Sequence, residues 1–245
     1  MSIDKIYFAC MSLNNFGDHL SVWLPEQITK RQYGFSNDRE LIISGSVLQE
    51  AMPETVVYGA GFGAMFQRTD ASYISYVRGE LTKQLLKQHG NPANPQVFEP
   101  AYCLREFFED VTPDIDVGYI PHYVDDGWCK PPDWHYIGIC TGIENVMREM
   151  LRCKKIVTSS LHGMVIADLF ERPSCLVRVS DKIAGDGFKY VDYWSFVNKA
   201  PYAPIPIEQR EAIELILTIP PQKFSKGTEA KNYLHNLTTY LNTMP

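Results

Sequence analysis

Short apolar runs alternate with amphipathic stretches along the first half of the chain. The apolar runs predict strands at residues 5–9, 41–44, 55–58 and 73–77. The amphipathic stretches predict helices at residues 19–30 and 80–88, with Pro25 as a kink in the first of them. Residues 14–18 are expected to form the loop between the first strand and the first helix. Strands that alternate with helices are typical of βα units on a parallel sheet.

An acidic, proline-containing segment at residues 109–114 lacks apolar periodicity and separates two halves. Beyond it, the pattern predicts strands at 117–120, 136–139, 155–158 and 175–179, and helices at 143–152, 161–170, 209–217 and 230–241. Thr141-Gly142-Ile143-Glu144 matches a capping box ahead of the first of these helices. We therefore predict an α/β protein with an N-terminal domain at 1–112 and a C-terminal domain at 113–245. The terminal helix of the second domain is able to pack back onto the first. Ligands in such sheets bind beyond the carboxyl ends of the strands.

The composition narrows the classes of function. Hydrophobic residues make up 45% of the 245 residues, enough for a real core, and the net charge is −6. An acidic surface repels phosphate backbones, so nucleic acid is not an expected partner.

The six cysteines form no Cys-x-x-Cys pair, which favours free thiols in a reducing compartment and argues against zinc. The N-terminus lacks a signal-peptide pattern and no apolar run is long enough for a membrane span, so we expect a cytoplasmic protein.

The strongest candidate site joins a buried strand to a helix through two hydroxyl residues. It consists of Ser159, Ser160, Leu161, His162 and Gly163. With Ser160 as the N-cap, His162 falls in the first turn, where free amides and the helix dipole favour a phosphate or carboxylate. A histidine there can donate to a phosphate or move a proton. The alternative is a capped helix with a histidine packed beside it, and the spacing alone favours that alternative.

Three loops of the first half carry further candidates. Asn15, Gly17 and Asp18 follow the first strand, where Gly17 permits a close approach and Asp18 either caps the helix or accepts a proton from a sugar hydroxyl. Gly61 lies in a Gly-x-Gly-x-Gly run that opens no obvious helix, so it fails as a dinucleotide motif and indicates close backbone packing at the cleft. Arg78 lies where a strand gives way to a helix, and its guanidinium is either an anion ligand or an ordinary surface charge.

The second half adds two candidates. His122 follows a predicted strand and either faces the cleft or packs against the strand. Lys189 lies among aromatic residues at 188–194, which suits a sugar or phosphate site and equally an amphipathic surface helix. The chain has no Gly-x-Ser-x-Gly elbow, no phosphate-binding P-loop and no His-Glu-x-x-His motif. Neither a metal nor a cofactor is predicted.

The order of the motifs is more specific than any one of them. Asn-Phe-Gly-Asp ends at Asp18, Gly-x-Gly lies near residue 60, Val-Arg-Gly contains Arg78, Gly-Tyr-Ile-Pro-His-Tyr contains His122, and residues 142–173 contain the Ser-Ser-Leu-His-Gly passage. Over roughly residues 5–195 this order resembles the polysaccharide pyruvyltransferase family, closest to its bacterial exopolysaccharide branch. The resemblance implies a glycosyltransferase-B-like fold, with two Rossmann-like domains facing across a cleft, the acceptor on the N-terminal side and the donor on the C-terminal side.

The resemblance also implies an activity and residue roles. Family members move pyruvate from phosphoenolpyruvate onto a sugar as a ketal, with His162 expected here as the acid and Asp18 as the base. Many members carry arginine before Leu-His; this chain has Ser160 there, so the donor contacts are expected to fall to Arg78, Lys182 or Lys189. The predicted substrate-binding residues are Asn15, Gly17, Gly61, Arg78, His122, Ser159, Ser160, Leu161, Gly163, Lys182 and Lys189.

The partners implied are a small-molecule donor and a sugar acceptor, free or lipid-linked, at a location that is cytoplasmic or peripheral to the inner membrane face. Two other functions stay open. One is a glycosyltransferase of the same fold that uses a nucleotide sugar, and the other is a non-catalytic protein that binds a sugar or an anion. The sequence predicts no oligomeric state.

Overall fold

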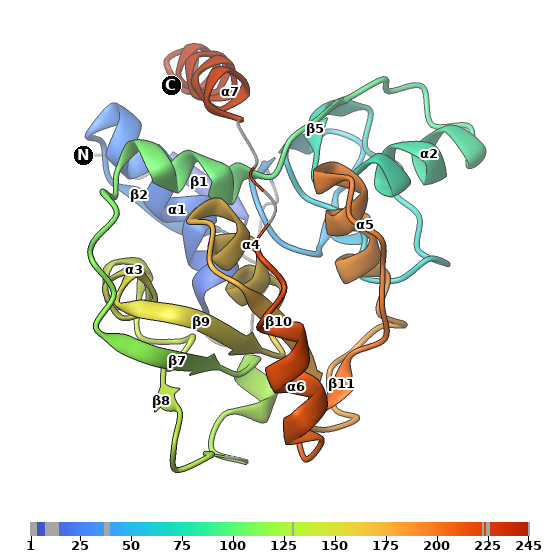
Figure 1. Cartoon of the computed structure of the whole chain (residues 1–245). Helices are drawn as coiled ribbons and strands as arrows, with labels where there is room; N and C mark the ends of the chain where they lie inside the picture. The colour runs from blue at the N-terminus through green and yellow to red at the C-terminus, as the bar shows by residue number, and fades with distance from the viewer. Residues whose placement is uncertain are drawn as a thin grey trace.

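Parallel sheets form the framework of the chain (Figure 1). The computed structural model describes residues 4–7, 15–36, 40–128, 130–221, 223 and 226–244. Strands β1 and β2 form one sheet, a second has the order β3-β4-β5-β6, and a third the order β11-β10-β9-β7-β8. Every described pairing is parallel, which confirms the predicted α/β class. The glycosyltransferase-B-like arrangement of two domains stays a prediction.

The elements follow the predicted alternation in both halves. Those of the first half are β1 (Asp4–Tyr7), α1 (Phe16–Thr29), β2 (Tyr33–Ser36), β3 (Leu41–Ile42), η1 (Leu48–Glu50), β4 (Val56–Tyr58), β5 (Tyr73–Val77), α2 (Glu80–Gln88), β6 (Gln96–Val97) and η2 (Pro100–Glu106). Those of the second half are β7 (Ile115–Ile120), η3 (Tyr123–Asp125), β8 (His135–Tyr136), α3 (Ile143–Leu151), β9 (Cys153–Thr158), α4 (Leu161–Leu169), β10 (Ser174–Arg178), α5 (Phe188–Val197), β11 (Ile205–Pro206), α6 (Arg210–Ile216) and α7 (Gly227–Leu241).

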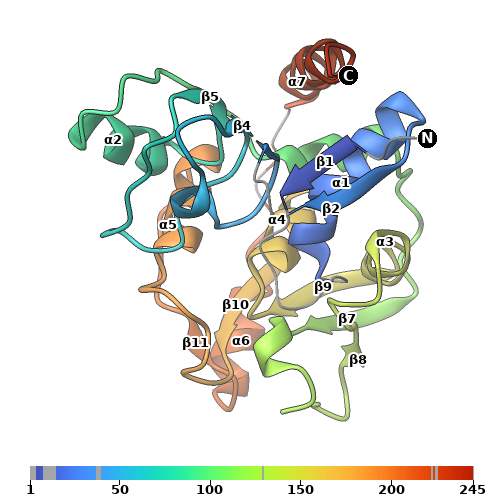
Figure 2. The same cartoon turned by 180° about the vertical axis from the view of Figure 1, so that it is seen from behind.

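Helix α4 is the central element of the core. Its residues from Leu161 to Asp168 are all buried, as expected of a helix that is apolar on every side. It packs on β9, β10 and α5, and Figures 1 and 2 both show it in the middle of the molecule. Because α4 is enclosed in this way, its first turn is held in place by the packing of the whole helix.

Two late helices return to the first half of the chain. Helix α5 packs against α2, and α7 packs against α1 and η2 (Figure 2). The Tyr233 hydroxyl of α7 donates to the Tyr58 carbonyl at 2.5 Å. The division into domains 1–112 and 113–245 therefore stays a prediction: the sheets separate between Val97 and Ile115, whereas α5 and α7 join the two parts.

Two local expectations are wrong, and one of the two alternatives left open for residues 188–194 is excluded. Residues 14–18 are not all loop, because α1 begins at Phe16, whose N–H donates to the Ile139 carbonyl at 3.1 Å. The capping box does not form: the N-cap is Gly142 at a φ of 92°, and the Glu144 carboxylate instead accepts from the Trp23 indole. The aromatic helix α5 is largely buried rather than amphipathic and exposed.

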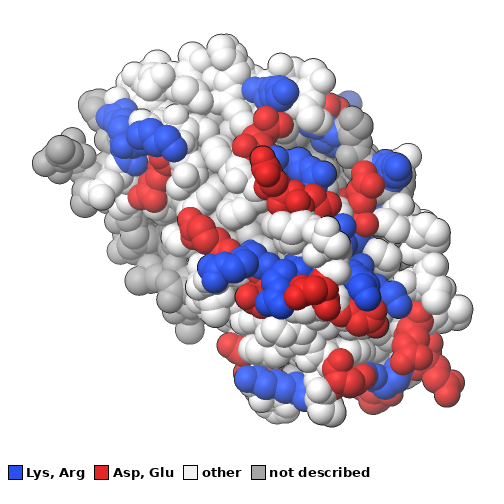
Figure 3. Space-filling view, turned by 60° about the vertical axis from the view of Figure 1, so that its left-hand side comes forward, with Lys and Arg blue, Asp and Glu red and all other residues white. Residues whose placement is uncertain are grey.

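The charged surface is mixed in sign. In the view of Figure 3, lysine and arginine atoms lie between aspartate and glutamate atoms without a continuous basic band. Ion pairs of this kind join Arg152 to Asp114 and Arg172 to Asp110. Within the described residues, no helix combines the length and hydropathy that a membrane crossing requires.

Candidate functional site

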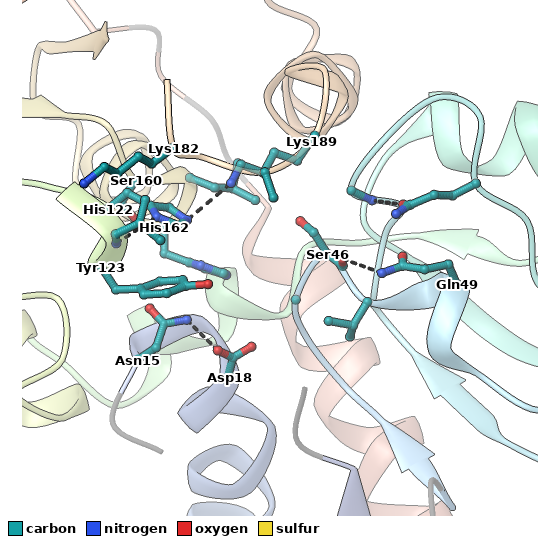
Figure 4. A pocket seen from close by; sticks show the side chains of 18 residues that line it. Asn15, Asp18, Ser46, Gln49, His122, Tyr123, Ser160, His162, Lys182 and Lys189 are labelled. Atoms are coloured by element: carbon teal, nitrogen blue, oxygen red, sulfur yellow. Dashed lines mark hydrogen bonds between the residues drawn. The ribbon is translucent and has the colours of Figure 1, made fainter. Parts of the chain in front are cut away.

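A pocket of about 300 Å³ lies where the loops of the two larger sheets meet (Figure 4). One wall comes from the first half: the start of α1, the loop after β3 and the loop after β4. The other wall comes from the second half: the ends of β7 and β9, the loop after β10, and α5. Because parallel strands end at these loops, the pocket occupies the position where open α/β sheets bind ligands.

The pocket unites most of the predicted site residues. Those that line it are Asn15, Asp18, His122, Ser160, Leu161, His162, Lys182 and Lys189. Those that do not line it are Gly17, Gly61, Arg78, Ser159 and Gly163. The second group lies directly behind the first, and each of its members supports a pocket residue or packs the wall.

The turn from β9 into α4 is held by the hydroxyl of Thr158. This oxygen donates to the Ile120 carbonyl at 2.7 Å and accepts from the Ser160 N–H at 2.9 Å. Ser160 is the N-cap, as predicted, although its hydroxyl makes no capping hydrogen bond. A side chain on Gly163 would stand 2.3 Å from the Thr158 hydroxyl oxygen, so glycine is required for α4 to lie this close to the strand.

His162 is a buried histidine with an unused nitrogen. Its side chain lines the pocket with only 8% exposure, and Nε2 has no hydrogen-bond partner among the residues that the structure describes. Burial, helped by the nearby charges of Arg78 and Lys189, lowers the pKa of His162 to about 3. His162 is therefore a neutral imidazole at neutral pH, and a buried nitrogen that stays unpaired costs about 1–3 kcal/mol unless a ligand meets it.

Gly17 packs against the imidazole of His162. A Cβ at this position would lie 2.1 Å from Cε1 of His162, a distance that no side chain tolerates. The Phe16 ring lies on the same imidazole, with ring centroids 5.8 Å apart. The start of α1 therefore fixes the orientation of the His162 ring. The sequence predicted a close approach at Gly17, and the group that approaches it is this imidazole.

Lys189 and His122 form the basic part of the pocket. The Lys189 ammonium lies 3.4 Å from Nε2 of His122 (Figure 4). Burial and the charge of Arg78 lower the pKa of Lys189 to about 8, against the opposing attraction of Asp125 and Asp18. Burial and the charge of Lys189 lower the pKa of His122 to about 3. At neutral pH Lys189 is mostly charged and His122 is neutral.

A hydroxyl and carboxylate network supports this wall from behind. The buried Asp125 accepts from the hydroxyls of Ser159, at 2.7 Å, and Ser180, at 2.5 Å. The Ser159 hydroxyl oxygen also accepts from the His122 N–H at 2.9 Å. The Ser159 carbonyl accepts from the Tyr190 hydroxyl at 2.8 Å. Ser159 therefore positions His122 and α5, and its predicted contact with the substrate stays a prediction.

Acidic and basic groups face each other across the opening. Asp18, 8% exposed in the first turn of α1, accepts from the Asn15 amide at 2.5 Å (Figure 4). On the far wall, the Lys182 ammonium lies 3.6 Å from the centre of the Trp128 ring. The pocket thus offers carboxylate and cation on opposite sides, a pairing suited to proton transfer beside a bound anion.

Arg78 lies inside the molecule rather than at the pocket surface. It is 1% exposed and pairs with Asp192 of α5 at 2.9 Å. Its remaining guanidinium nitrogens donate to the Ser46 hydroxyl and to the Phe62 carbonyl, each at 2.7 Å. A side chain on Gly61 would lie 2.4 Å from this guanidinium. This buried position matches neither alternative considered for Arg78, an ordinary surface charge or an exposed anion ligand. A direct role of Arg78 in donor binding stays a prediction.

Sequence reasoning missed the neutral residues of the first wall. The side chains of Ser46, Gln49 and Gln67 line the pocket from the loops after β3 and β4. Gln67 accepts from the N–H groups of Gly63 and Ala64 at 2.7 and 2.9 Å, which shapes its loop. Their only signal was position, since each lies shortly after a strand, and no charge or motif marked them. Among the described residues, no cluster of metal-ligand side chains is found here or elsewhere.

Comparison with known proteins gives one family. The model of the polysaccharide pyruvyl transferase family matches residues 15–181. The succinoglycan biosynthesis protein ExoV of Rhizobium meliloti (strain 1021) is 26% identical over 224 residues, which cover 84% of this chain and 69% of that protein. An uncharacterized protein of Acanthamoeba polyphaga mimivirus is 32% identical over 165 residues, which cover 62% of this chain and 58% of that protein. No solved structure gives a significant match.

Proposed function

Because the chain belongs to the polysaccharide pyruvyl transferase family, we propose that it moves pyruvate from phosphoenolpyruvate onto two hydroxyls of a sugar, closing a pyruvate ketal in this pocket. The donor is a substrate, and the proposal requires no cofactor. The acceptor is a sugar of a polysaccharide or of a free or lipid-linked precursor. The reaction is proposed to take place in the cytoplasm or at the inner face of the membrane.

The unequal chemistry of the two walls supports this proposal. The second-half wall carries Lys182, Lys189, His122 and His162 beside the start of α4, a combination that attracts an anion. The first-half wall carries hydroxyl and amide side chains together with Asp18. Phosphoenolpyruvate, with its phosphate and carboxylate, suits the cationic wall, and an uncharged sugar suits the wall of hydroxyl, amide and carboxylate groups.

The unpartnered Nε2 of His162 is the observation that carries the proposal. Arrival of the donor phosphate raises the pKa of His162, because an adjacent negative charge favours the imidazolium. The proton so gained moves to the methylene carbon of the donor, and positive charge develops at the carbon that bears the phosphate. Asp18 takes the proton of the first sugar hydroxyl as its oxygen bonds to that carbon.

Release of phosphate completes the transfer. The bond between this carbon and the phosphate oxygen breaks, and the second sugar hydroxyl bonds in its place, giving up its proton to the departing phosphate. Asp18 returns its proton to His162 through the pocket. Atoms and charges balance, since one hydroxyl proton ends on the new methyl group and the other on the phosphate. Lys189 neutralises the phosphate throughout.

Phosphate release tests the proposal directly. The purified chain is incubated with phosphoenolpyruvate and candidate oligosaccharides, and inorganic phosphate is measured beside the mass of the sugar product. We expect phosphate to appear together with a mass gain of one pyruvate less one water. Sugar transfer from a nucleotide sugar would support the glycosyltransferase alternative, and donor binding without turnover on any acceptor would support the non-catalytic one.

A histidine variant assigns the chemistry to this pocket. His162→Gln keeps a hydrogen-bond donor but cannot deliver a proton, so we expect turnover to fall by about a hundredfold or more with an unchanged melting temperature. His235→Gln is the matched control, because His235 is exposed on α7 and outside the pocket. Near wild-type phosphate release by a folded His162→Gln enzyme would remove His162 from the mechanism.

A further inference from the structure

A second cleft lies between strands of the β3-β4-β5-β6 sheet and the C-terminal part of α7. Two adjoining cavities of about 390 and 550 Å³ share Tyr58, Ser75, Asn94 and Tyr240 among their lining residues. Strand β4 contributes Val56 and Tyr58, β5 contributes residues 73–76, and α7 contributes Asn236 and residues near its end. The cleft shares no lining residue with the pocket that holds His162 and Lys189.

The cleft differs from the pocket in charge. Among the described residues that line either cavity, none is an aspartate, glutamate, lysine, arginine or histidine. Charged residues make up 21% of this chain, and surfaces normally concentrate them. A lining without charged side chains suits a neutral ligand better than a phosphate or a carboxylate.

The lining combines aromatic faces with hydrogen-bonding groups. Tyr73 is 63% exposed, and the rings of Tyr58 and Tyr240 stack with centroids 5.3 Å apart. The exposed side chains of Asn94 and Gln96 supply amide donors and acceptors beside them. Tyrosine and amide side chains together match a sugar ring, which has apolar C–H faces and a rim of hydroxyls.

We propose that this cleft is a second binding site for an uncharged stretch of oligosaccharide, remote from the reaction. The inference deepens the proposed function, because a polysaccharide acceptor is far longer than a pocket of about 300 Å³ can hold. Binding in this cleft keeps a long acceptor on the enzyme while one of its sugars occupies the pocket.

Binding without turnover tests this inference. The full chain is screened against an array of neutral and acidic oligosaccharides, and calorimetry then measures the strongest neutral ligand without phosphoenolpyruvate. We expect neutral oligosaccharides to bind, and Tyr73→Ala or Asn94→Ala to weaken the strongest by at least about tenfold. Leu215→Ala is the control, since Leu215 is 68% exposed on α6, away from the cleft. Both tested side chains are exposed, so the variants are expected to fold.

Two results would overturn the inference. One is the absence of binding by any neutral oligosaccharide on the array. The other is binding that Lys189→Met abolishes and Tyr73→Ala leaves unchanged, which would confine the sugar to the pocket. Tyr73-dependent binding without phosphate release would instead support the cleft while contradicting the proposed pyruvyl transfer, so the two proposals can fail separately.

Discussion

A buried lysine such as Lys189 weakens the fold that holds it. Its side chain is 8% exposed, and its pKa of about 8 lies below the ordinary 10.5 because the charged form has lost water. A difference of this size corresponds to a destabilisation on the order of 3 kcal/mol at neutral pH. Groups held at such a cost are typical of binding and catalytic sites.

We predict that Lys189→Met stabilises the protein while it weakens donor binding. The gain in unfolding free energy is greatest below pH 8, where Lys189 is charged in both the folded and unfolded chain. It shrinks as the pH rises from about 8 to 10.5, because the folded state loses its proton first and wild-type stability recovers. Chemical denaturation at several pH values measures this, with the exposed Lys231→Met as the control. Equal stability of Lys189→Met and wild type at pH 7 would contradict it.

At the residue scale, the sequence predicted which side chains line the pocket better than it predicted which side chains are buried. His162 and Lys189 have side chains of reactive types near the start of a helix, so both were predicted as site residues, and both line the pocket. Arg78 was misplaced because its partner, Asp192, lies 114 residues away in the chain. Ser46 and Gln49 were missed because hydroxyl and amide residues are common in loops, and only the fold brings theirs to the pocket.

At the scale of elements, the contact between α1 and α4 decides the orientation of His162. We predict that Gly17→Ala reduces activity much more than stability, since the new methyl group would occupy the position of Cε1 of His162. Alanine is the better helix former by about 1 kcal/mol, which offsets part of the packing cost. The Gly227→Ala variant is the control, because a side chain there meets no atom within 4 Å. Wild-type turnover by Gly17→Ala would show that the His162 ring moves without consequence.

The link between β5 and α5 depends on a buried ion pair. We predict that Arg78→Ala lowers the free energy of unfolding by about 3–5 kcal/mol, because it leaves the carboxylate of Asp192 buried without its cation. Thr82 still donates to this carboxylate at 2.8 Å from both its N–H and its hydroxyl, which is too little to balance the charge.

Denaturation of Arg78→Ala beside Arg152→Ala measures the effect. Arg152 pairs with Asp114 at the surface, where solvent screens the pair, so its loss is expected to change stability little. Unchanged stability of Arg78→Ala, accompanied by weaker binding of phosphoenolpyruvate, would restore Arg78 to the direct donor-binding role that the sequence suggested.

Elements with strong local signals were predicted closely, and those without such signals were not. The strand Tyr73–Val77 and the helix Glu80–Gln88 have the predicted bounds. The two-residue strands β6 and β11 are stabilised by pairing with β5 and β10, so no local sequence pattern predicts them. The capping box failed because Gly142 adopts a φ of 92° and Glu144 finds Trp23 on another helix, which is a tertiary contact.

At the scale of the molecule, the return of α5 and α7 could not be predicted from local patterns. Both helices follow strands of the second half in sequence, yet they cover the first half in space. This arrangement brings Lys189, from α5, to face Asp18, from α1, across one opening (Figure 4). The pocket therefore depends on the docking of both halves.

The assembled pocket makes a final prediction about protons. At neutral pH it contains two neutral histidines, His122 and His162, whose pKa values are about 3, and Lys189, whose pKa is about 8. A bound anion raises all three pKa values, because each group then gains an opposite charge in a buried site. We therefore expect the binding of phosphoenolpyruvate to take up protons, and its affinity to fall as the pH rises through 8, where Lys189 loses its charge.

Calorimetry in two buffers of different ionisation enthalpy measures this uptake. At pH 7 we expect the apparent enthalpies to differ by the uptake of up to about one proton, assigned mainly to His162, because the proposed reaction needs it there. His162→Gln should remove most of that uptake and leave the loss of affinity above pH 8, whereas Lys189→Met should remove the latter. Binding that is independent of buffer and of pH between 7 and 9 would mean that the anion does not approach these groups. The cationic wall would then not be the donor site, even if the enzyme released phosphate.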